Sequence, residues 1–534
     1  MTFSVSPLVR GSISPAARLT RLLLFAAWLA LVAWLAAGHV FWRDEVRAYS
    51  LALSGSNFVE MLRNVHGEGH PALWYIMLRA GHDLFPVREV LPVAAALVGI
   101  AAMALVAFTS PFRVPIVAAV LFSSFGAFEY VVVARNYGIA ALVMFALAAL
   151  YPRIRTSLWF GTLLLILCNT NVPSCIIAAS FLLFRLIEML SAGLNQTRRA
   201  WLIFAGNAVL ALGGAILCFL TVYPTFNDQA VSSNFGLLGA GKLADALLDA
   251  QQGFSHFGFG SFYYFGHRPW QPLDIALLSL CCLGLVRSPA GLLASLFGFV
   301  GLKLFFFLIY PSAYRHEALF FVFLLALHWM TAGGAGGNWP RDKRWLRVPE
   351  FVGVYVFIAL LAFQSVRLVN PIVQRLNGIP YSRSADVGRL LELPELSRAI
   401  VVADPDTMAE PIAYYSNNPL WFLRQQRFGS VVRLRATDRR YMPIDAVLSD
   451  AERLHRQTGR PIVFLTHHPL ETERPEHYVT MYDDETAIDP QSVARFRSST
   501  RMVGRLWPAG TDETYEVYVY PRSTLGSLTE STTR

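Results

Sequence analysis

The sequence has few charged residues and almost no lysine. Charged residues make up 15% of its 534 residues, whereas a typical soluble domain carries about a quarter. Lysine occurs only at Lys242, Lys303 and Lys343, so the net charge of +9 comes almost entirely from arginine. No basic run has interleaved aromatic residues, and we therefore expect no nucleic-acid partner.

Cysteine is also scarce, and all five cysteines lie in apolar segments: Cys168, Cys175, Cys218, Cys281 and Cys282. We interpret them as small buried apolar residues. The adjacent pair at 281 and 282 suits neither a metal site nor an ordinary disulfide.

Long apolar segments fill most of the chain instead. Hydrophobic residues make up 54% of it and the mean hydropathy is +0.44, which indicates a membrane protein. Charges are sparse before residue 370 and dense after it. The sequence therefore predicts a transmembrane domain over 1–370 and a soluble domain over 375–525.

A membrane span needs about 20 apolar residues, and we predict about eleven spans. The first is kept as a span rather than a signal peptide because many more follow. The stretch 157–190 is broken by Asn169–Pro173, so it is either two short spans or one interrupted helix. The predicted spans are 20–41, 90–112, 114–130, 135–151, 157–171, 173–190, 201–223, 273–287, 288–310, 315–333 and 350–370.

Arginines at the ends of these segments favour a cytoplasmic N-terminus. Eleven spans then place the C-terminal domain outside, together with two long loops, 42–89 and 224–272. The first loop contains an amphipathic patch, 71–78, suited to the membrane interface. The second is rich in Gly, Phe and Tyr, and our hypothesis for it is a mobile lid.

The C-terminal domain is predicted to be a small α/β domain. Buried-strand and helix patterns alternate along it. The predicted strands are 399–403, 461–465 and 513–520, and the predicted helices are 386–393 and 444–456.

Two adjacent carboxylates, Asp44 and Glu45, follow the first span directly. A partly desolvated carboxylate at a membrane face can act as a general base or bind a cation. The alternative is structural, with Asp44 capping a helix over 45–54. The two interpretations do not exclude each other.

Further polar residues occur at His66, Glu68 and His70, on a glycine-rich stretch. They are either ligands for a divalent metal or ordinary polar loop residues, because their spacing is not a standard ligand motif.

Two short outside turns also carry charge. Glu129, Arg135 and Tyr137 flank the first, which suggests either an ion pair that closes the turn or a phosphate site at Arg135. Arg315 and His316 lie on the second, where arginine suits phosphate recognition and also suits an interfacial anchor. Lys303 lies before this turn and either extends outward or faces a cavity. All four clusters fall on one side of the predicted membrane.

The order of these motifs resembles that of the C-type (GT-C) membrane glycosyltransferases, among them bacterial relatives of the protein mannosyltransferases and the aminoarabinose transferases. The resemblance covers about residues 20 to 335 and depends on order, since each motif is short. The motifs are the acidic pair, His70-Pro71 before an aromatic-rich helix, Glu129-x5-Arg135-x-Tyr137, Asn169-Thr170-Asn171 and Tyr314-Arg315-His316.

The resemblance implies inverting transfer from a polyprenyl-phosphate sugar to a lipid, glycan or protein acceptor, outside the bacterial inner membrane. It implies that Asp44 is the general base and that Glu45 assists it or a metal. It further implies that cationic side chains stabilise the leaving phosphate, and that other polar residues shape the site. The implied phosphate group is Arg135, Arg315, Lys303 and His316, and the implied shaping group is His66, Glu68, His70, Glu129 and Tyr137.

The chain departs from many relatives at Asn171, where they have His, so the need for a divalent metal stays open. Two other functions also stay open. A lipid-linked oligosaccharide polymerase or ligase would use the outside arginines without Asp44. A transporter or flippase would need polar residues in mid-span, and these are few here.

Overall fold

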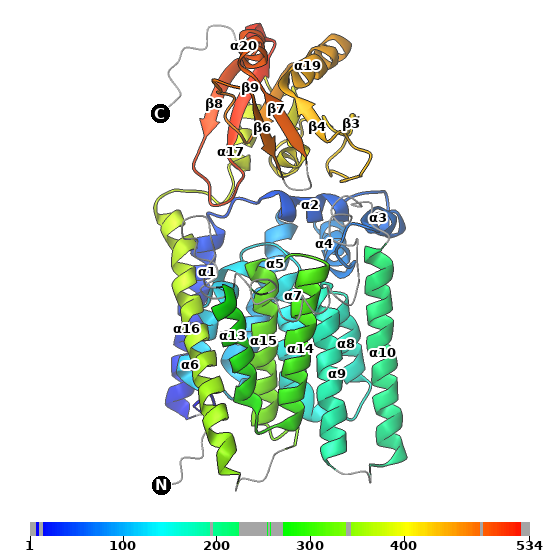
Figure 1. Ribbon diagram of the computed structural model, residues 1–534, viewed down its shortest axis with the longest axis vertical. Coiled ribbons are helices and arrows are strands. Elements are labelled where there is room, and N and C mark those ends of the chain that lie inside the picture. The colour runs from blue at the N-terminus through cyan, green and yellow to red at the C-terminus, as the bar shows by residue number, and fades with distance from the viewer. Residues whose placement is uncertain are drawn as a thin grey trace.

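The computed structural model describes residues 7–9, 14–192, 196–223, 254, 257, 271–337, 343–480 and 484–524. Within them, a bundle of apolar helices stands below a mixed α/β domain, with three short helices between the two (Figure 1). Most of the predicted loop 224–272, for which a lid was our hypothesis, lies outside the described residues.

Seven helices in the described part of the chain are long and apolar enough to cross a membrane. They are α1 (Pro15–Ala36), α5 (Val90–Thr109), α7 (Tyr137–Ile154), α9 (Pro173–Ser191), α10 (Arg198–Val222), α14 (Pro289–Leu308) and α16 (Arg347–Leu376). Several begin where the sequence provides a cap or a proline. Ser14 accepts a hydrogen bond from the Ala17 amide at the start of α1, and Pro173 opens α9.

The other four predicted spans also coincide with helical segments, which are shorter or more polar. The prediction of a polytopic helical protein is confirmed, and eleven crossings remains a prediction. These segments are α6 (Val114–Leu121) with the π-helical turn η1 (Phe125–Glu129), α8 (Trp159–Cys168), α13 (Gln271–Cys282) with η3 (Leu283–Leu285), and α15 (Tyr314–Ala332).

Helix α15 lies at the centre of the bundle, with almost every side chain buried. The bundle also depends on small residues at helix crossings. At Gly353 of α16, an added Cβ would lie only 2.1 Å from the backbone nitrogen of Gly284. A larger residue at Gly353 would therefore push α16 away from η3.

Helix α16 is longer than its predicted span, because it continues past residue 370 to Leu376 and leads directly into the C-terminal domain (Figure 1). Three short helices lie under that domain, in the loop that follows α1. They are α2 (Arg43–Ala52), α3 (Phe58–Val65) and α4 (Leu73–Leu84).

The C-terminal domain is α/β, as predicted, with a six-stranded mixed sheet in the order β3-β2-β1-β5-β9-β8. Its strands are β1 (Ile400–Asp404), β2 (Leu420–Phe422), β3 (Arg427–Phe428), β5 (Ile462–Thr466), β8 (Arg501–Leu506) and β9 (Tyr515–Tyr520). A second sheet, in the order β4-β7-β6, contains β4 (Tyr441–Pro443), β6 (Glu476–Val479) and β7 (Glu485–Ile488).

The central strands β1 and β5 are buried along their whole length because helices cover both faces of the sheet. One face packs against α17 (Ser384–Leu391), η5 (Asp406–Ala409) and α18 (Ile412–Tyr415). The other packs against α19 (Ile444–Thr458) and α20 (Pro490–Ser499). The structure thus adds six strands to the three predicted ones and moves the predicted boundaries by one or two residues.

Two arginines of helix α2 form ion pairs with the C-terminal domain. Arg43 donates to both carboxylate oxygens of Asp512, each at 2.9 Å, and its backbone N–H donates to Glu513 at 2.7 Å. One turn along the helix, Arg47 donates to Glu410 at 2.5 Å and to the Val432 carbonyl at 2.8 Å. These contacts fix α2 between the bundle and the domain.

We expect Glu410→Gln to destabilise this interface, because it leaves the largely buried Arg47 with less compensating charge. Removing one partner of a buried ion pair costs about 3–5 kcal/mol; glutamine keeps one acceptor, so we expect about 2–3 kcal/mol. Thermal unfolding in detergent, with hydrogen exchange of α2, would measure it. The control is Glu471→Gln, because Glu471 pairs with Arg497 at the exposed surface. Equal unfolding temperatures for wild type and Glu410→Gln would contradict this role.

Candidate functional site

The candidate site centres on the carboxylate of Asp44, in the first turn of α2. Its Oδ2 lies 3.1 Å from Nη1 of Arg135 and 3.2 Å from Nη2 of Arg315. Arg135 lies just before α7 and Arg315 at the start of α15, so two distant turns meet at one oxygen. The expectation that an acid after the first span lies beside these arginines therefore agrees with the geometry.

Asp44 is not a helix cap, and that interpretation is wrong. Helix α2 begins at Arg43, with Trp42 at the N-cap position. The carboxylate of Glu45 accepts the Trp42 N–H at 3.2 Å and so serves the helix start. Asp44 therefore has no capping role, and 27% of its side-chain surface is exposed.

Burial alone would raise the pKa of the Asp44 carboxyl, but the guanidinium charges of Arg135 and Arg315 hold it well below its usual range. Asp44 is therefore ionised at neutral pH and is a weak base while both arginines hold it.

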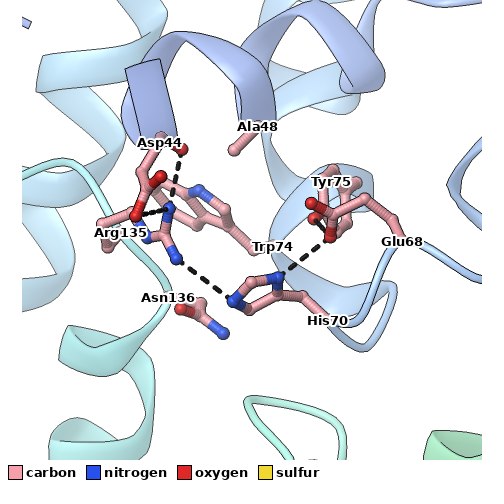
Figure 2. Close-up of a pocket in the computed structure, with 8 residues that line it drawn as sticks. All are labelled: Asp44, Ala48, Glu68, His70, Trp74, Tyr75, Arg135 and Asn136. Carbon is pink, nitrogen blue, oxygen red and sulfur yellow. Dashed lines mark hydrogen bonds and ion pairs between the residues drawn. The ribbon is translucent and has the colours of Figure 1, made fainter. Parts of the chain in front are cut away.

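A chain of polar contacts continues from Arg135 into the adjoining pocket (Figure 2). Nη2 of Arg135 lies 3.1 Å from Nε2 of His70, and Nδ1 of His70 lies 2.9 Å from Glu68. Arginine can only donate, so Nε2 of His70 is the acceptor and Nδ1 carries the proton. Tyr75 donates to Glu68 at 2.5 Å, and Arg47 donates to it at 3.0 Å.

Burial would raise the pKa of Glu68, but the contacts with His70, Arg47 and Tyr75 lower it to about 2. Glu68 is therefore a permanent anion that orients His70 and Arg47. Glu68 and His70, two of the three residues that we considered as metal ligands, pair with each other. Each also contacts an arginine, Glu68 through Arg47 and His70 through Arg135. Among the described residues, no group of three or more His, Cys, Asp or Glu side chains could hold a metal ion.

The pocket is small, with room for about one water molecule. Asp44, Glu68, His70 and Arg135 contribute its charged and titratable groups, and the remaining lining residues are Ala48, Trp74, Tyr75 and Asn136 (Figure 2). Trp74, Tyr75 and Asn136 were not predicted as site residues. The patch 71–78 was read as interfacial, yet Trp74 and Tyr75 are buried beside Glu68.

Several buried N–H donors near this pocket have no acceptor among the described residues. They are Nε of Arg315, one Nη of Arg47 and the indole groups of Trp42 and Trp74. Trp42 lies against Arg315, whose guanidinium carbon is 5.1 Å from the indole ring centre. Buried donors without partners are costly, so this part of the site suits a ligand rich in acceptor oxygens.

Tyr137 and His316 lie behind the arginines, with the Tyr137 hydroxyl 2.7 Å from Nε2 of His316. The Ala313 N–H donates to Nδ1 of His316 at 2.8 Å. Because Nδ1 is an acceptor, Nε2 carries the proton of the neutral ring and donates to Tyr137. His316 thus braces Tyr137 rather than contacting Asp44 directly.

Four other predicted site residues lie apart from the pocket. Glu45 is fully buried and binds His39 at 3.0 Å and the Ala134 N–H at 2.6 Å. This geometry makes it a structural anchor and does not support catalytic assistance. His66 is exposed at the end of α3, and Lys303 is buried in α14.

The fourth is Glu129, which ends η1 and is close enough to Arg315 for their charges to interact. The predicted ion pair between Glu129 and Arg135 does not form, because Arg135 pairs with Asp44 instead.

A helical membrane body, short helices at one end and a C-terminal α/β domain above them make up the fold, which is the one expected from the resemblance seen in the sequence. A similar solved structure is the crystal structure of ArnT from Cupriavidus metallidurans bound to undecaprenyl phosphate. Its TM-score is 0.50 at 14% sequence identity, over 95% of this chain and 98% of that one.

The apo structure of the same ArnT gives a TM-score of 0.49 at 13% identity, with the same coverage. No protein-family model and no curated protein matches the sequence. At 14% identity, the likeness to the undecaprenyl phosphate complex shows a shared fold.

We expect Glu45→Gln to destabilise the protein, because an amide donor would then face the N–H groups of Trp42 and Ala134. A buried donor without an acceptor costs about 1–3 kcal/mol. Thermal unfolding would show this loss, and Glu471→Gln, at a position 59% exposed, is the control. If Glu45→Gln unfolded at the same temperature as wild type and Glu471→Gln, the assignment of Glu45 as anchor would be wrong.

Proposed function

We propose that this protein is an inverting glycosyltransferase that moves a sugar from a polyprenyl-phosphate carrier to an acceptor hydroxyl. The reaction would take place at the extracytoplasmic face of the bacterial inner membrane. The observation that carries the proposal is the meeting of one carboxylate, two arginines and several unpartnered N–H donors beside one pocket.

Each group has a chemical role in such a transfer. Asp44 accepts the proton of the acceptor hydroxyl, whose oxygen attacks the anomeric carbon of the sugar. The bond from that carbon to the phosphate oxygen breaks, and the polyprenyl phosphate leaves with the electron pair. Arg135 and Arg315 stabilise the negative charge that grows on the phosphate. One displacement with base and leaving group on opposite sides gives inversion.

The other polar residues position these three. His70 holds Arg135 through Nε2, and Glu68 fixes the tautomer of His70. The ArnT structure of the same fold is a complex with undecaprenyl phosphate, which supports a lipid phosphate as the ligand here. The juxtamembrane position of α2 supports a substrate that arrives from the bilayer (Figure 1).

We expect Asp44→Asn to lose transfer, because the amide keeps an acceptor oxygen for Arg135 and Arg315 but cannot take a proton from the acceptor hydroxyl. A general base contributes about 10²–10⁴-fold, so kcat should fall by at least about 100-fold. The assay is transfer in vitro with a panel of polyprenyl-phosphate sugars, and Glu60→Gln, an exposed acid on α3, is the matched control. Wild-type turnover by Asp44→Asn would remove the proposed base and would favour the polymerase or ligase alternative.

We expect Arg315→Ala to weaken donor binding more than acceptor binding. A hydrogen bond to a charged group contributes about 1.5–3 kcal/mol, which corresponds to a Kd about 10- to 150-fold higher for the polyprenyl-phosphate sugar. Binding measurements on both substrates would separate the two effects. Arg389→Ala is the control, because Arg389 is 72% exposed in the C-terminal domain. An unchanged donor Kd in Arg315→Ala would count against the phosphate role.

A further inference from the structure

The ion pairs between Asp44 and the two arginines leave no room for the groups of the transfer reaction. Oδ2 of Asp44 touches both arginines, at 3.1 and 3.2 Å. During transfer, the acceptor oxygen and the sugar must lie between the base and the phosphate that the arginines bind. Reacting atoms approach to about 3–3.5 Å, and the base needs a further hydrogen bond of about 2.6–3.2 Å to the acceptor. A direct contact between Asp44 and the arginines therefore leaves no room for either group.

We propose that the Asp44 carboxylate occupies the position of the donor phosphate in the free protein, and that the arriving phosphate displaces it from Arg135 and Arg315. The displaced carboxylate then becomes the base, so donor binding itself switches on the acceptor side of the site. This inference rests on the proposed function for its consequence, but the displacement is a binding event that can be measured without any transfer.

The two arginines keep their places when the carboxylate leaves. Arg135 is also bound to the Asp44 backbone carbonyl at 2.8 Å and to His70 at 3.1 Å. Arg315 lies over the Trp42 ring, and the Tyr130 hydroxyl donates to its carbonyl at 2.7 Å. Two like charges this close need an anion between them, which Asp44 provides before the phosphate arrives.

Helix α2 also keeps its place, so only the Asp44 side chain has to move. Arg43 precedes Asp44 and is tied to Asp512 and Glu513 of the C-terminal domain. Arg47 follows it by one turn and is tied to Glu410 and Glu68. These ties commit both flanking arginines to other carboxylates, so neither competes with Arg135 and Arg315 for the donor.

The unpartnered donors show where the extra oxygens of a phosphate would bind. Oδ2 of Asp44 accepts a hydrogen bond from Nη2 of Arg315 and forms an ion pair with Nη1 of Arg135, and Nε of Arg315 has no acceptor among the described residues. A phosphate presents more oxygens than this one carboxylate oxygen. Asp44 itself lines the adjoining pocket, which has room for about one water molecule, so the released carboxylate would turn toward this pocket (Figure 2).

The test is the affinity of detergent-solubilised protein for undecaprenyl phosphate, measured by calorimetry for wild type, Asp44→Asn and Asp44→Ser. If the carboxylate blocks the site nine-tenths of the time, the apparent Kd of the wild type is about tenfold above the intrinsic value. Both variants should therefore bind undecaprenyl phosphate about tenfold more tightly, although they cannot transfer sugar. The serine variant decides the question if the asparagine variant does not fold.

The control for a general gain of positive charge is Asp512→Asn, which removes a carboxylate that pairs with Arg43 on the same helix. Its Kd should stay within about twofold of wild type. Unchanged or weaker binding by the Asp44 variants would overturn the proposal, as would equal tightening in Asp512→Asn. Tighter binding by the Asp44 variants in a protein with no transferase activity would uphold the displacement and refute the proposed function instead.

Discussion

The architecture of the site depends on one anion held between two cations. Arg135 and Arg315 come from turns on different helices, and both would be repelled from a common point without the Asp44 oxygen between them. Near a membrane such charges are costly unless they are paired or used. The pairing therefore explains why the start of α2, the turn before α7 and the start of α15 converge, and why the bundle keeps a polar centre at this end.

Neighbouring acids in this protein do different work because their surroundings differ. Glu45 has no exposed surface, and its carboxylate oxygens bind two backbone N–H groups and His39. Asp44, one residue earlier, points to the pocket and keeps partial access to solvent. Glu68 differs from both, because its contacts with His70, Arg47 and Tyr75 lower its pKa to about 2. It therefore serves as a fixed negative charge that orients His70. Three nearby carboxyl groups thus differ in their surroundings: Glu45 anchors the backbone, Glu68 orients His70, and Asp44, the proposed base, lines the pocket.

The sequence alone predicted the apolar helices and the C-terminal α/β domain, and its expectation that Asp44 lies beside Arg135 and Arg315 agrees with the ion pairs in the structure. Hydropathy and the order of motifs carry that information. It could not separate Asp44 from Glu45, because burial distinguishes them and adjacent residues share one pattern. It missed Glu410 and Asp512, since their partners on α2 are more than 360 residues away. It also misassigned Trp74 and Tyr75, because an amphipathic helix can cover a pocket as well as a membrane surface.

Arg47 has a consequence for how the C-terminal domain relates to the rest of the chain. Its guanidinium donates both to Glu68 of the pocket and to Glu410 of the C-terminal domain. One positive charge therefore links the pocket to the domain. A chimaera that carried a foreign domain without an acid at this point would leave the largely buried guanidinium of Arg47 without one of its two carboxylate partners. The domain is therefore not an exchangeable module, and any graft or swap has to transplant this carboxylate with it.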